Sequence, residues 1–145
     1  MKLKIKKLRH DAVMPSRATN GSAGFDLCAC ITETITLKSG SIAMIPTGLS
    51  AEPDCSDAAL LIYPRSGLSS KYGIALANCV GVVDSDYRGE IMIPLINHGK
   101  SDFVIENGMR IAQLVISPII VPEIVPAESV SETERGSGGF GSTGL

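Results

Sequence analysis

The chain has 145 residues, of which 44% are hydrophobic, so it is long enough for one domain with a sizeable core. It has no Trp and only 4% aromatic residues, so aliphatic side chains must fill that core. The formal net charge is −2, which offers no electrostatic footprint for duplex nucleic acid or for an anionic membrane. We therefore expect neither nucleic acid nor a membrane among its partners.

Short strands divided by turns are predicted along most of the chain. Near the start, lysines alternate with Leu3, Ile5 and Leu8, which is typical of a strand with one solvent-exposed face. The alternative, that these lysines form a basic segment that binds nucleic acid, is the weaker interpretation. Further strands are predicted at residues 34–37, 41–45, 47–51, 59–63, 73–83, 90–96, 103–105, 110–116 and 119–125. The strands 73–83 and 90–96 should form a hairpin that turns at residues 84–86. The only expected helix is a short one near residues 53–59.

This series of short strands favours an all-β barrel or jelly roll over the region 1–130. A β-sandwich with a pure binding role has the same pattern, so the fold class alone does not decide the function.

Residues 131–145 differ from the rest, with five glycines in fifteen positions. This segment has too few apolar residues for a core of its own, so we expect a flexible arm. An inert tail has no use for Arg135 and Phe140 among the glycines. Arg135, Ser142 and Thr143 offer groups for phosphate, and the Phe140 ring can stack on a base, as in a lid over a nucleotide.

The four cysteines do not form a metal-binding pattern. Cys28 and Cys30 are the only close pair, and no His or further Cys stands at zinc-ligand spacing from them. The first residues lack the apolar region of a secretory leader, and no apolar run approaches the ~20 residues of a membrane span. We expect a reduced protein of the cytoplasm.

A second candidate for phosphate binding follows the predicted strand 59–63. Arg65 offers a fork of donors, Ser66 a hydroxyl, and Gly67 an open backbone amide. Alone, this short run is a weak signal. The sequence has no Walker A loop, no G-x-G-x-x-G that opens a helix and no G-x-S-x-G elbow, which argues against P-loop and Rossmann enzymes.

Carboxylates gather on the predicted hairpin. Asp84, Asp86 and Glu90 are each a candidate base or metal ligand, although without further context a solvated turn is the favoured interpretation. Asp26 stands among apolar residues and needs a partner there. Arg110, which interrupts another apolar segment, is the natural candidate.

Five segments, in order, resemble the motifs of the trimeric dUTPase family. They are AGFDL at 23–27, PRSGLSSKYG at 64–73, GVVDSDYRGEI at 81–91, RIAQLVI at 110–116 and RGSGGFGSTG at 135–144. Each is modest alone, but together they span nearly the whole chain and are highly specific. The resemblance, which is to bacterial members at residues 53–63, implies a jelly-roll-like β-clip barrel in a C3 homotrimer. It also implies active sites shared between subunits, with the arm 131–145 closing over them.

The resemblance implies a dUTP diphosphatase that hydrolyses dUTP to dUMP and pyrophosphate with Mg²⁺, which keeps uracil out of DNA and supplies dUMP for dTMP synthesis. Asp84 is the implied catalytic base, which activates a water for attack on the α-phosphorus. The implied substrate-binding residues are Asn78, Val82, Val83, Asp84, Tyr87 and Met92 for base and sugar, Arg65, Ser66, Gly67 and Gln113 for phosphates, and Arg135, Phe140, Gly141, Ser142 and Thr143 in the arm. Asp26 is implied to contact the Mg²⁺ through water.

Two alternatives remain open at this point. One is a dCTP deaminase, or its bifunctional relative, on the same fold. The other is a regulatory or interaction protein built on a dUTPase scaffold.

Overall fold

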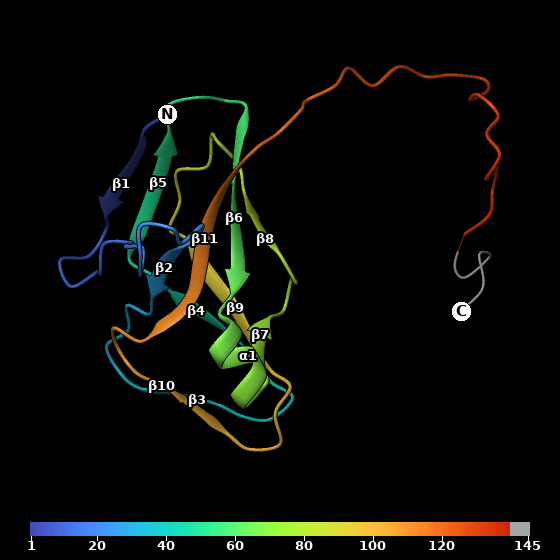
Figure 1. Cartoon of the computed structure of the whole chain (residues 1–145). Coiled ribbons are helices and arrows are strands. Elements are labelled where there is room, and N and C mark those ends of the chain that lie inside the picture. The colour runs from blue at the N-terminus through green and yellow to red at the C-terminus, as the bar shows by residue number, and fades with distance from the viewer. Residues whose placement is uncertain (140–145) are drawn as a thin grey trace.

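The computed structural model describes residues 1–139, which contain eleven strands and one short helix (Figure 1). The strands are β1 (Leu3–Lys7), β2 (Phe25–Cys28), β3 (Ile35–Leu37), β4 (Ile42–Pro46), β5 (Leu49–Pro53), β6 (Ala58–Pro64), β7 (Ile74–Leu76), β8 (Gly81–Val83), β9 (Met92–Asn97), β10 (Phe103–Ile105) and β11 (Arg110–Pro118). The helix is α1 (Ser66–Tyr72). These elements confirm the predicted all-β class.

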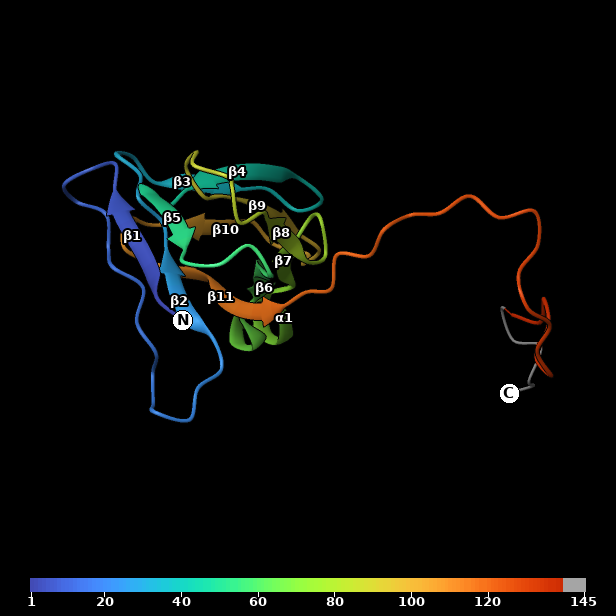
Figure 2. The same ribbon diagram turned by 90° about the horizontal axis from the view of Figure 1, so that it is seen from above.

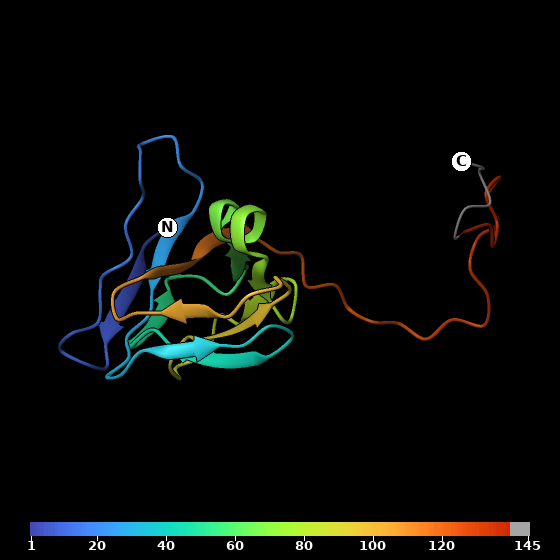
Figure 3. The same cartoon turned by 90° about the horizontal axis from the view of Figure 1, so that it is seen from below.

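The strands form four small antiparallel sheets around one core, in a jelly-roll-like β-clip barrel. The largest sheet has the strand order β2-β11-β6-β8, and the next has the order β4-β9-β7. The pairs β1-β5 and β10-β3 complete the barrel. Helix α1 lies at one side of the barrel and strand β3 at the opposite side (Figure 3).

Leucine and isoleucine side chains fill the core, as the composition predicts. The largest side chains that are less than 2% exposed are Leu27, Leu37, Ile45, Leu49, Leu60, Ile74, Ile91, Ile93, Leu95, Ile105, Ile111 and Leu114. They come from all four sheets and belong to one apolar cluster. Burial of each contributes about 1.5–3 kcal/mol before the entropy of ordering the chain is subtracted.

The helix lies at residues 66–72, so its prediction at residues 53–59 was wrong. Residues 54–57 instead turn the chain between β5, which ends at Pro53, and β6, which starts at Ala58. Local signals for α1 are poor, because the N-cap residue Arg65 makes no side-chain cap and the first turn contains Gly67. The helix depends on tertiary packing, since Leu68 lies against the core.

The predicted strand 73–83 is in fact two short strands in different sheets. Cys79 has φ 61°, a left-handed conformation, and redirects the chain between β7 and β8. The hairpin prediction is confirmed for β7, where Ile74 is paired with Asn97 of β9. It was wrong for β8, which pairs with β6. The loop 84–91 therefore crosses from the largest sheet to the sheet β4-β9-β7.

After β11 the chain leaves the barrel as an extended, exposed segment (Figures 1 and 2). The strand predicted at 119–125 does not form there, because prolines at 118, 122 and 126 interrupt any ladder of backbone donors. Ile120 and Ile124 are 92% and 85% exposed. Among residues 1–139, no helix has the length and apolar character needed to cross a membrane.

Candidate active site

A hollow of about 200 Å³ lies between the end of β8 and the start of β9. This acid pocket is lined by Val82, Val83, Asp84, Tyr87, Glu90, Ile91 and Met92. It brings together five of the residues that the resemblance assigns to base, sugar and catalysis. The sequence pattern did not reveal its other two walls, Glu90 and Ile91, as parts of a pocket.

The loop that forms the acid pocket is folded back on itself. The Tyr87 amide donates to the Asp84 carbonyl at 3.2 Å, and the Tyr87 hydroxyl donates to the Glu90 carbonyl at 3.0 Å. A Cβ at Gly89 would overlap the end of the Tyr87 side chain, so glycine at this position lets the ring lie against the loop. These contacts hold the half-exposed ring at the rim of the pocket.

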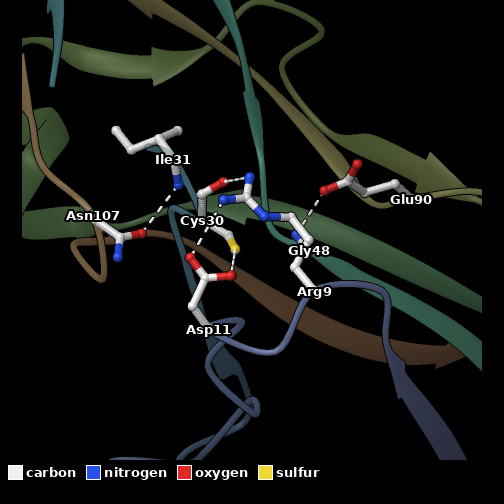
Figure 4. A network of polar contacts seen from close by, with 7 residues as sticks. All are labelled: Arg9, Asp11, Cys30, Ile31, Gly48, Glu90 and Asn107. Atoms are coloured by element: carbon white, nitrogen blue, oxygen red, sulfur yellow. Dashed lines mark hydrogen bonds and ion pairs between the residues drawn. The ribbon is translucent and has the colours of Figure 1, made fainter. Parts of the chain in front are cut away.

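The three carboxylates of this loop have different surroundings. Asp84 lines the acid pocket, and its side chain makes no hydrogen bond or ion pair with any residue in 1–139. Glu90 also lines the pocket, but its Oε1 accepts a hydrogen bond from the Gly48 amide at 2.7 Å (Figure 4). Asp86 lines a different hollow, beside Arg88. Of the three carboxylates, Asp84 is therefore the one that lines the acid pocket without a side-chain hydrogen bond to residues 1–139.

A second hollow, of about 370 Å³, is separate from the first. This arginine pocket is lined by Ala18, Ser22, Gly24, Asp26, Arg65, Ser66, Gly67 and Gln113. It contains Asp26 and all four residues outside the arm that the resemblance assigns to the phosphates. The residues from Ala18 to Gly24 were not singled out individually by sequence reasoning, because small and polar loop residues carry no distinctive signal.

Asp26 forms ion pairs with two arginines in this region. Arg65 Nε donates to Asp26 Oδ1 at 3.0 Å, and Arg110 Nη1 donates to Asp26 Oδ2 at 3.1 Å. The predicted partnership with Arg110 is confirmed, and Arg65 is an additional partner. Since the Asp26 side chain is only 15% exposed, the two guanidinium groups compensate a largely buried charge. Arg65 is held through Nε, which leaves its two terminal nitrogens for an anion.

Gln113 fixes the turn that carries Arg65. Its Nε2 donates to the Pro64 carbonyl at 3.0 Å. Its Oε1 lies over Gly24, where a Cβ atom would be only 2.5 Å away. Glycine at position 24 therefore makes room for the glutamine, and the two loops of the arginine pocket are locked together.

Asn78 and Arg135 lie outside both pockets. Asn78 is exposed in the turn before β8, with its Nδ2 close to Gly81. Arg135 lies in a turn of the extended segment, where its Nε donates to the Gly138 carbonyl at 3.0 Å. The other predicted arm residues, which are Phe140, Gly141, Ser142 and Thr143, lie outside the described residues.

Two buried thiols, those of Cys28 and Cys30, have raised pKa values and are therefore neutral near pH 7. Burial raises the pKa of the Cys28 thiol, and the nearby Asp26 carboxylate raises it further. Burial, with a hydrogen bond from the thiol to Asp11, likewise raises the pKa of Cys30. Neutral thiols are poor metal ligands. In the described part of the chain, no group of three or more His, Cys, Asp or Glu side chains is arranged to hold a metal ion.

The two pockets lie at opposite corners of the sheet β2-β11-β6-β8. Val83, at the acid pocket, is paired with Leu60 of β6, and Arg65 stands five residues further along. At ~3.3 Å per residue this separation is ~17 Å along the strand. Arg65 also points toward Asp26 on β2, the edge strand opposite β8. The phosphorus atoms of one triphosphate, joined through single oxygen bridges, do not span this distance.

The β-clip barrel carries a carboxylate-lined hollow and a separate arginine-lined hollow, an arrangement suited to an enzyme that acts on phosphorylated ligands. The model of the dUTPase family matches residues 10–144. The chain belongs to the dUTPase family.

Bacterial relatives agree with this assignment. The chain is 48% identical to the deoxyuridine 5'-triphosphate nucleotidohydrolase of Desulfitobacterium hafniense over 147 residues, which covers 100% of this chain and 97% of that protein. It is 52% identical to the enzyme of that name from Rickettsia felis over 145 residues, which covers 99% and 97%.

Solved structures give the same result. A point mutant of the dUTPase of Staphylococcus bacteriophage 80alpha with dUpNHpp superposes with a TM-score of 0.89 at 30% identity and covers 99% of both chains. A dUTPase from phage phi11 of S. aureus, described with a structural Mg(II) ion, superposes with a TM-score of 0.81 at 26% identity and covers 91% of this chain and 100% of that chain. The family and the fold indicated by the five motifs are therefore confirmed.

Proposed function

We propose that this chain hydrolyses dUTP to dUMP and pyrophosphate with Mg²⁺, as a homotrimer in the cytoplasm. In a cell, this reaction keeps uracil out of DNA and supplies dUMP for dTMP synthesis. The full-length match to deoxyuridine 5'-triphosphate nucleotidohydrolases supports the substrate. The observation that carries the proposal is the Asp84 carboxylate, unpaired within residues 1–139, in a hollow that Tyr87 and Met92 also line.

Asp84 is the proposed catalytic base. Its carboxylate orients a water and takes its proton as the oxygen attacks the α-phosphorus in line, and the pyrophosphate departs on the opposite side. A fixed carboxylate beside the reacting atom supplies the positioning on which phosphoryl transfer mainly depends. The polar surroundings that hold this loop in place support the assignment.

Base and sugar recognition is proposed for the turn around β8. The Asn78 amide and the backbone of residues 82–84 pair with the uracil edge, and a cytosine amino group there would face the wrong partner. Asn78 lies beside Gly81 at the start of β8, which supports this placement. Tyr87 packs under the deoxyribose, where a ribose 2′-OH would clash. The narrow turn also leaves no room for a C5 methyl group, so thymine is excluded.

The phosphates are proposed to bind in the arginine pocket of a neighbouring chain. Arg65, Ser66, Gly67 and Gln113 supply donors for the β- and γ-phosphates. The separation of ~17 Å along β6 between the two pockets of one chain supports a site that is shared between chains. One chain supplies Asp84 and its partner supplies Arg65.

An apolar surface on the barrel supports the proposed trimer. In the sheet β4-β9-β7, alternate residues of β4 and their partners on β9 point to the same outer face. These residues are Ile42, Met44, Pro46, Met92, Pro94 and Ile96, with no polar side chain among them. Ile42 is 58% exposed and Met44 is 54% exposed in the single chain. An apolar face of this kind is typical of a surface covered by another chain.

The donor set fits a Mg²⁺ ion held mainly by the substrate. Residues 1–139 contain no cluster of three acidic or His/Cys side chains that could cage an ion. Both oxygens of Asp26 already accept hydrogen bonds from arginines, so contact through water is the role that we assign to it. When bound, Mg²⁺ supplies charge neutralisation on the phosphates.

The arm is proposed to close over the bound nucleotide. Residues 1–130 contain the barrel, and residues 131–145 contain Arg135 with Phe140, Gly141, Ser142 and Thr143. The proposed roles are a grip on the γ-phosphate by Arg135, Ser142 and Thr143, and a cap on the uracil by Phe140. The extended segment after β11, which leaves the barrel, supports a reach toward another subunit (Figure 2).

The test of the proposed function is pyrophosphate release from dUTP, dCTP, dTTP and UTP in the presence of Mg²⁺. We expect rapid release from dUTP and little from the other three. Release of ammonia from dCTP would instead support the deaminase alternative. Asp84→Asn should still bind a non-hydrolysable dUTP analogue, while its kcat falls by at least about 100-fold. Hydrolysis by this variant at the parental rate would refute the assignment of the base.

A further inference from the structure

The loop that carries Asp84 is fastened to the start of β5 at several points. The Gly48 amide donates to Glu90 Oε1 at 2.7 Å, and the Thr47 hydroxyl donates to the Ile91 carbonyl at 2.7 Å. The Ser50 hydroxyl donates to the Arg88 carbonyl at 2.9 Å. The Ile91 amide donates to the Leu49 carbonyl at 2.8 Å. Four consecutive residues of one strand region, 47–50, therefore hold residues 88–91 of the loop.

The bond between Gly48 and Glu90 depends on an unusual backbone conformation. Gly48 has φ +68°, a left-handed conformation that favours glycine. A Cβ at this position would lie 2.8 Å from both the Ala12 Cβ and the Cys30 Sγ. The chain thus turns tightly against the core at Gly48 and presents its amide to the Glu90 carboxylate (Figure 4).

Thr47 supplies the second fixed point. Its side chain is fully buried, at 0% exposure, although threonine is polar. The hydroxyl donates a hydrogen bond to the Ile91 carbonyl and accepts one from the Leu49 amide at 3.3 Å, so it acts as both donor and acceptor. A buried, fully satisfied hydroxyl of this kind fixes one conformation of the segments that it joins.

We propose that Glu90 and Thr47 are positioning residues, which hold the loop 84–91 against the barrel so that Asp84 and Tyr87 keep their places in the acid pocket. This inference rests on the proposed function for the reaction that it supports. Glu90 acts through its Oε1 atom as a hydrogen-bond acceptor, and its negative charge has no part in the chemistry. It is neither the base nor a metal ligand, although it lines the same pocket as Asp84.

Two substitutions at Glu90 distinguish a positioning role from a role in the chemistry. Glu90→Gln keeps a carbonyl oxygen at the Oε1 position and removes the charge, whereas Glu90→Ala removes the acceptor. For a positioning residue, Glu90→Gln keeps kcat within about threefold of the parental value and leaves the pH–rate profile unchanged. Glu90→Ala lowers kcat by about tenfold or more, because a displacement of a catalytic group by about 1 Å can lower the reaction rate by up to about 100-fold.

A parallel pair of variants tests Thr47. Thr47→Val keeps the shape of the side chain but removes the hydroxyl, and Thr47→Ser restores it. We expect Thr47→Val to lower kcat by about tenfold and Thr47→Ser to recover most of the loss. Amide hydrogen exchange of residues 84–92 provides a readout independent of turnover, and it should be faster in Glu90→Ala and Thr47→Val only.

Asp102→Ala is the matched control. Asp102 Oδ1 also accepts a hydrogen bond from a distant backbone amide, that of Ser39 at 3.3 Å, but Asp102 lines neither pocket. This variant should keep the parental kcat and KM. If the parental chain fails to hydrolyse dUTP, the proposed function fails. The hydrogen-exchange measurements still test whether residues 47–50 hold the loop in place. If the parental chain is active and Glu90→Gln is as impaired as Glu90→Ala, the positioning role is overturned.

Discussion

Two inactive variants of this chain should restore activity when they assemble together. Asp84→Asn removes the proposed base from the acid pocket, and Arg65→Ala removes the guanidinium fork from the arginine pocket. Each variant alone lacks one half of every site. Because the pockets of one chain are separated by ~17 Å along β6, we expect a complete site to take its halves from two chains.

The size of the recovery follows from random assembly. With equal amounts of the two chains, a competent interface needs Asp84 from an Arg65→Ala chain and Arg65 from an Asp84→Asn chain. Each choice has a chance of one half, so about one quarter of the interfaces regain both groups. The assay is pyrophosphate release from dUTP after the two chains are unfolded and refolded as a mixture. We expect about one quarter of the parental kcat per chain.

The control for this mixture is a double variant. Asp84→Asn mixed with Asp84→Asn/Arg65→Ala also forms mixed assemblies, but none of their interfaces contains Asp84, so it should stay inactive. If the first mixture gives no more activity than the sum of its separate components, and native mass spectrometry shows that mixed assemblies have formed, then the site is not shared between chains. That result would leave the apolar outer face of β4 and β9 as the structural support for the proposed trimer.

Three further predictions concern the arm, the arginine pocket and the core. Deletion of residues 135–145 should abolish most dUTP turnover while light scattering shows an unchanged assembly; full activity of the truncated chain would contradict the role of a lid. Asp26→Asn should raise the KM for dUTP by about tenfold, because it removes the negative charge that orients Arg65 and Arg110; steady-state kinetics with an unchanged KM would contradict this orientation. Leu114→Ala, at a position with 0% exposure, should lower the free energy of unfolding by about 2–5 kcal/mol in urea denaturation at fixed protein concentration. A loss below about 1 kcal/mol would mean that the β11 region is not part of a well-packed core.

The sequence predicts those features of the fold that depend on local pattern and simple chemistry. The strand predicted at residues 103–105 has the same bounds in the structure, and the aliphatic core follows from the composition. The pairing of Asp26 with Arg110 follows from the need of a partly buried carboxylate for a partner. Each of these inferences uses information that is written within a few residues or in the overall composition.

The features that were missed depend on non-local contacts. The run 73–83 is apolar throughout, so nothing in its pattern indicates that β7 pairs with β9 while β8 pairs with β6. Helix α1 has weak local propensity and is held by Leu68 against the core. The fastening of Glu90 to Gly48 joins residues that are 42 positions apart, and only the folded chain brings them together.

The site's proposed division between chains gives Met92 a double role. Met92 begins β9, where it lines the acid pocket and also belongs to the apolar outer face of the sheet β4-β9-β7. A chain that covers this face would also cover the side of the pocket at which Met92 stands. Association and completion of the site then become one event, because the same contact that buries Met44 and Ile42 excludes water from the neighbourhood of Asp84. A loop that meets the phosphate-binding groups of a partner chain would need a fixed position, and the buried Thr47 hydroxyl and the left-handed Gly48 at its attachment to β5 would supply that position.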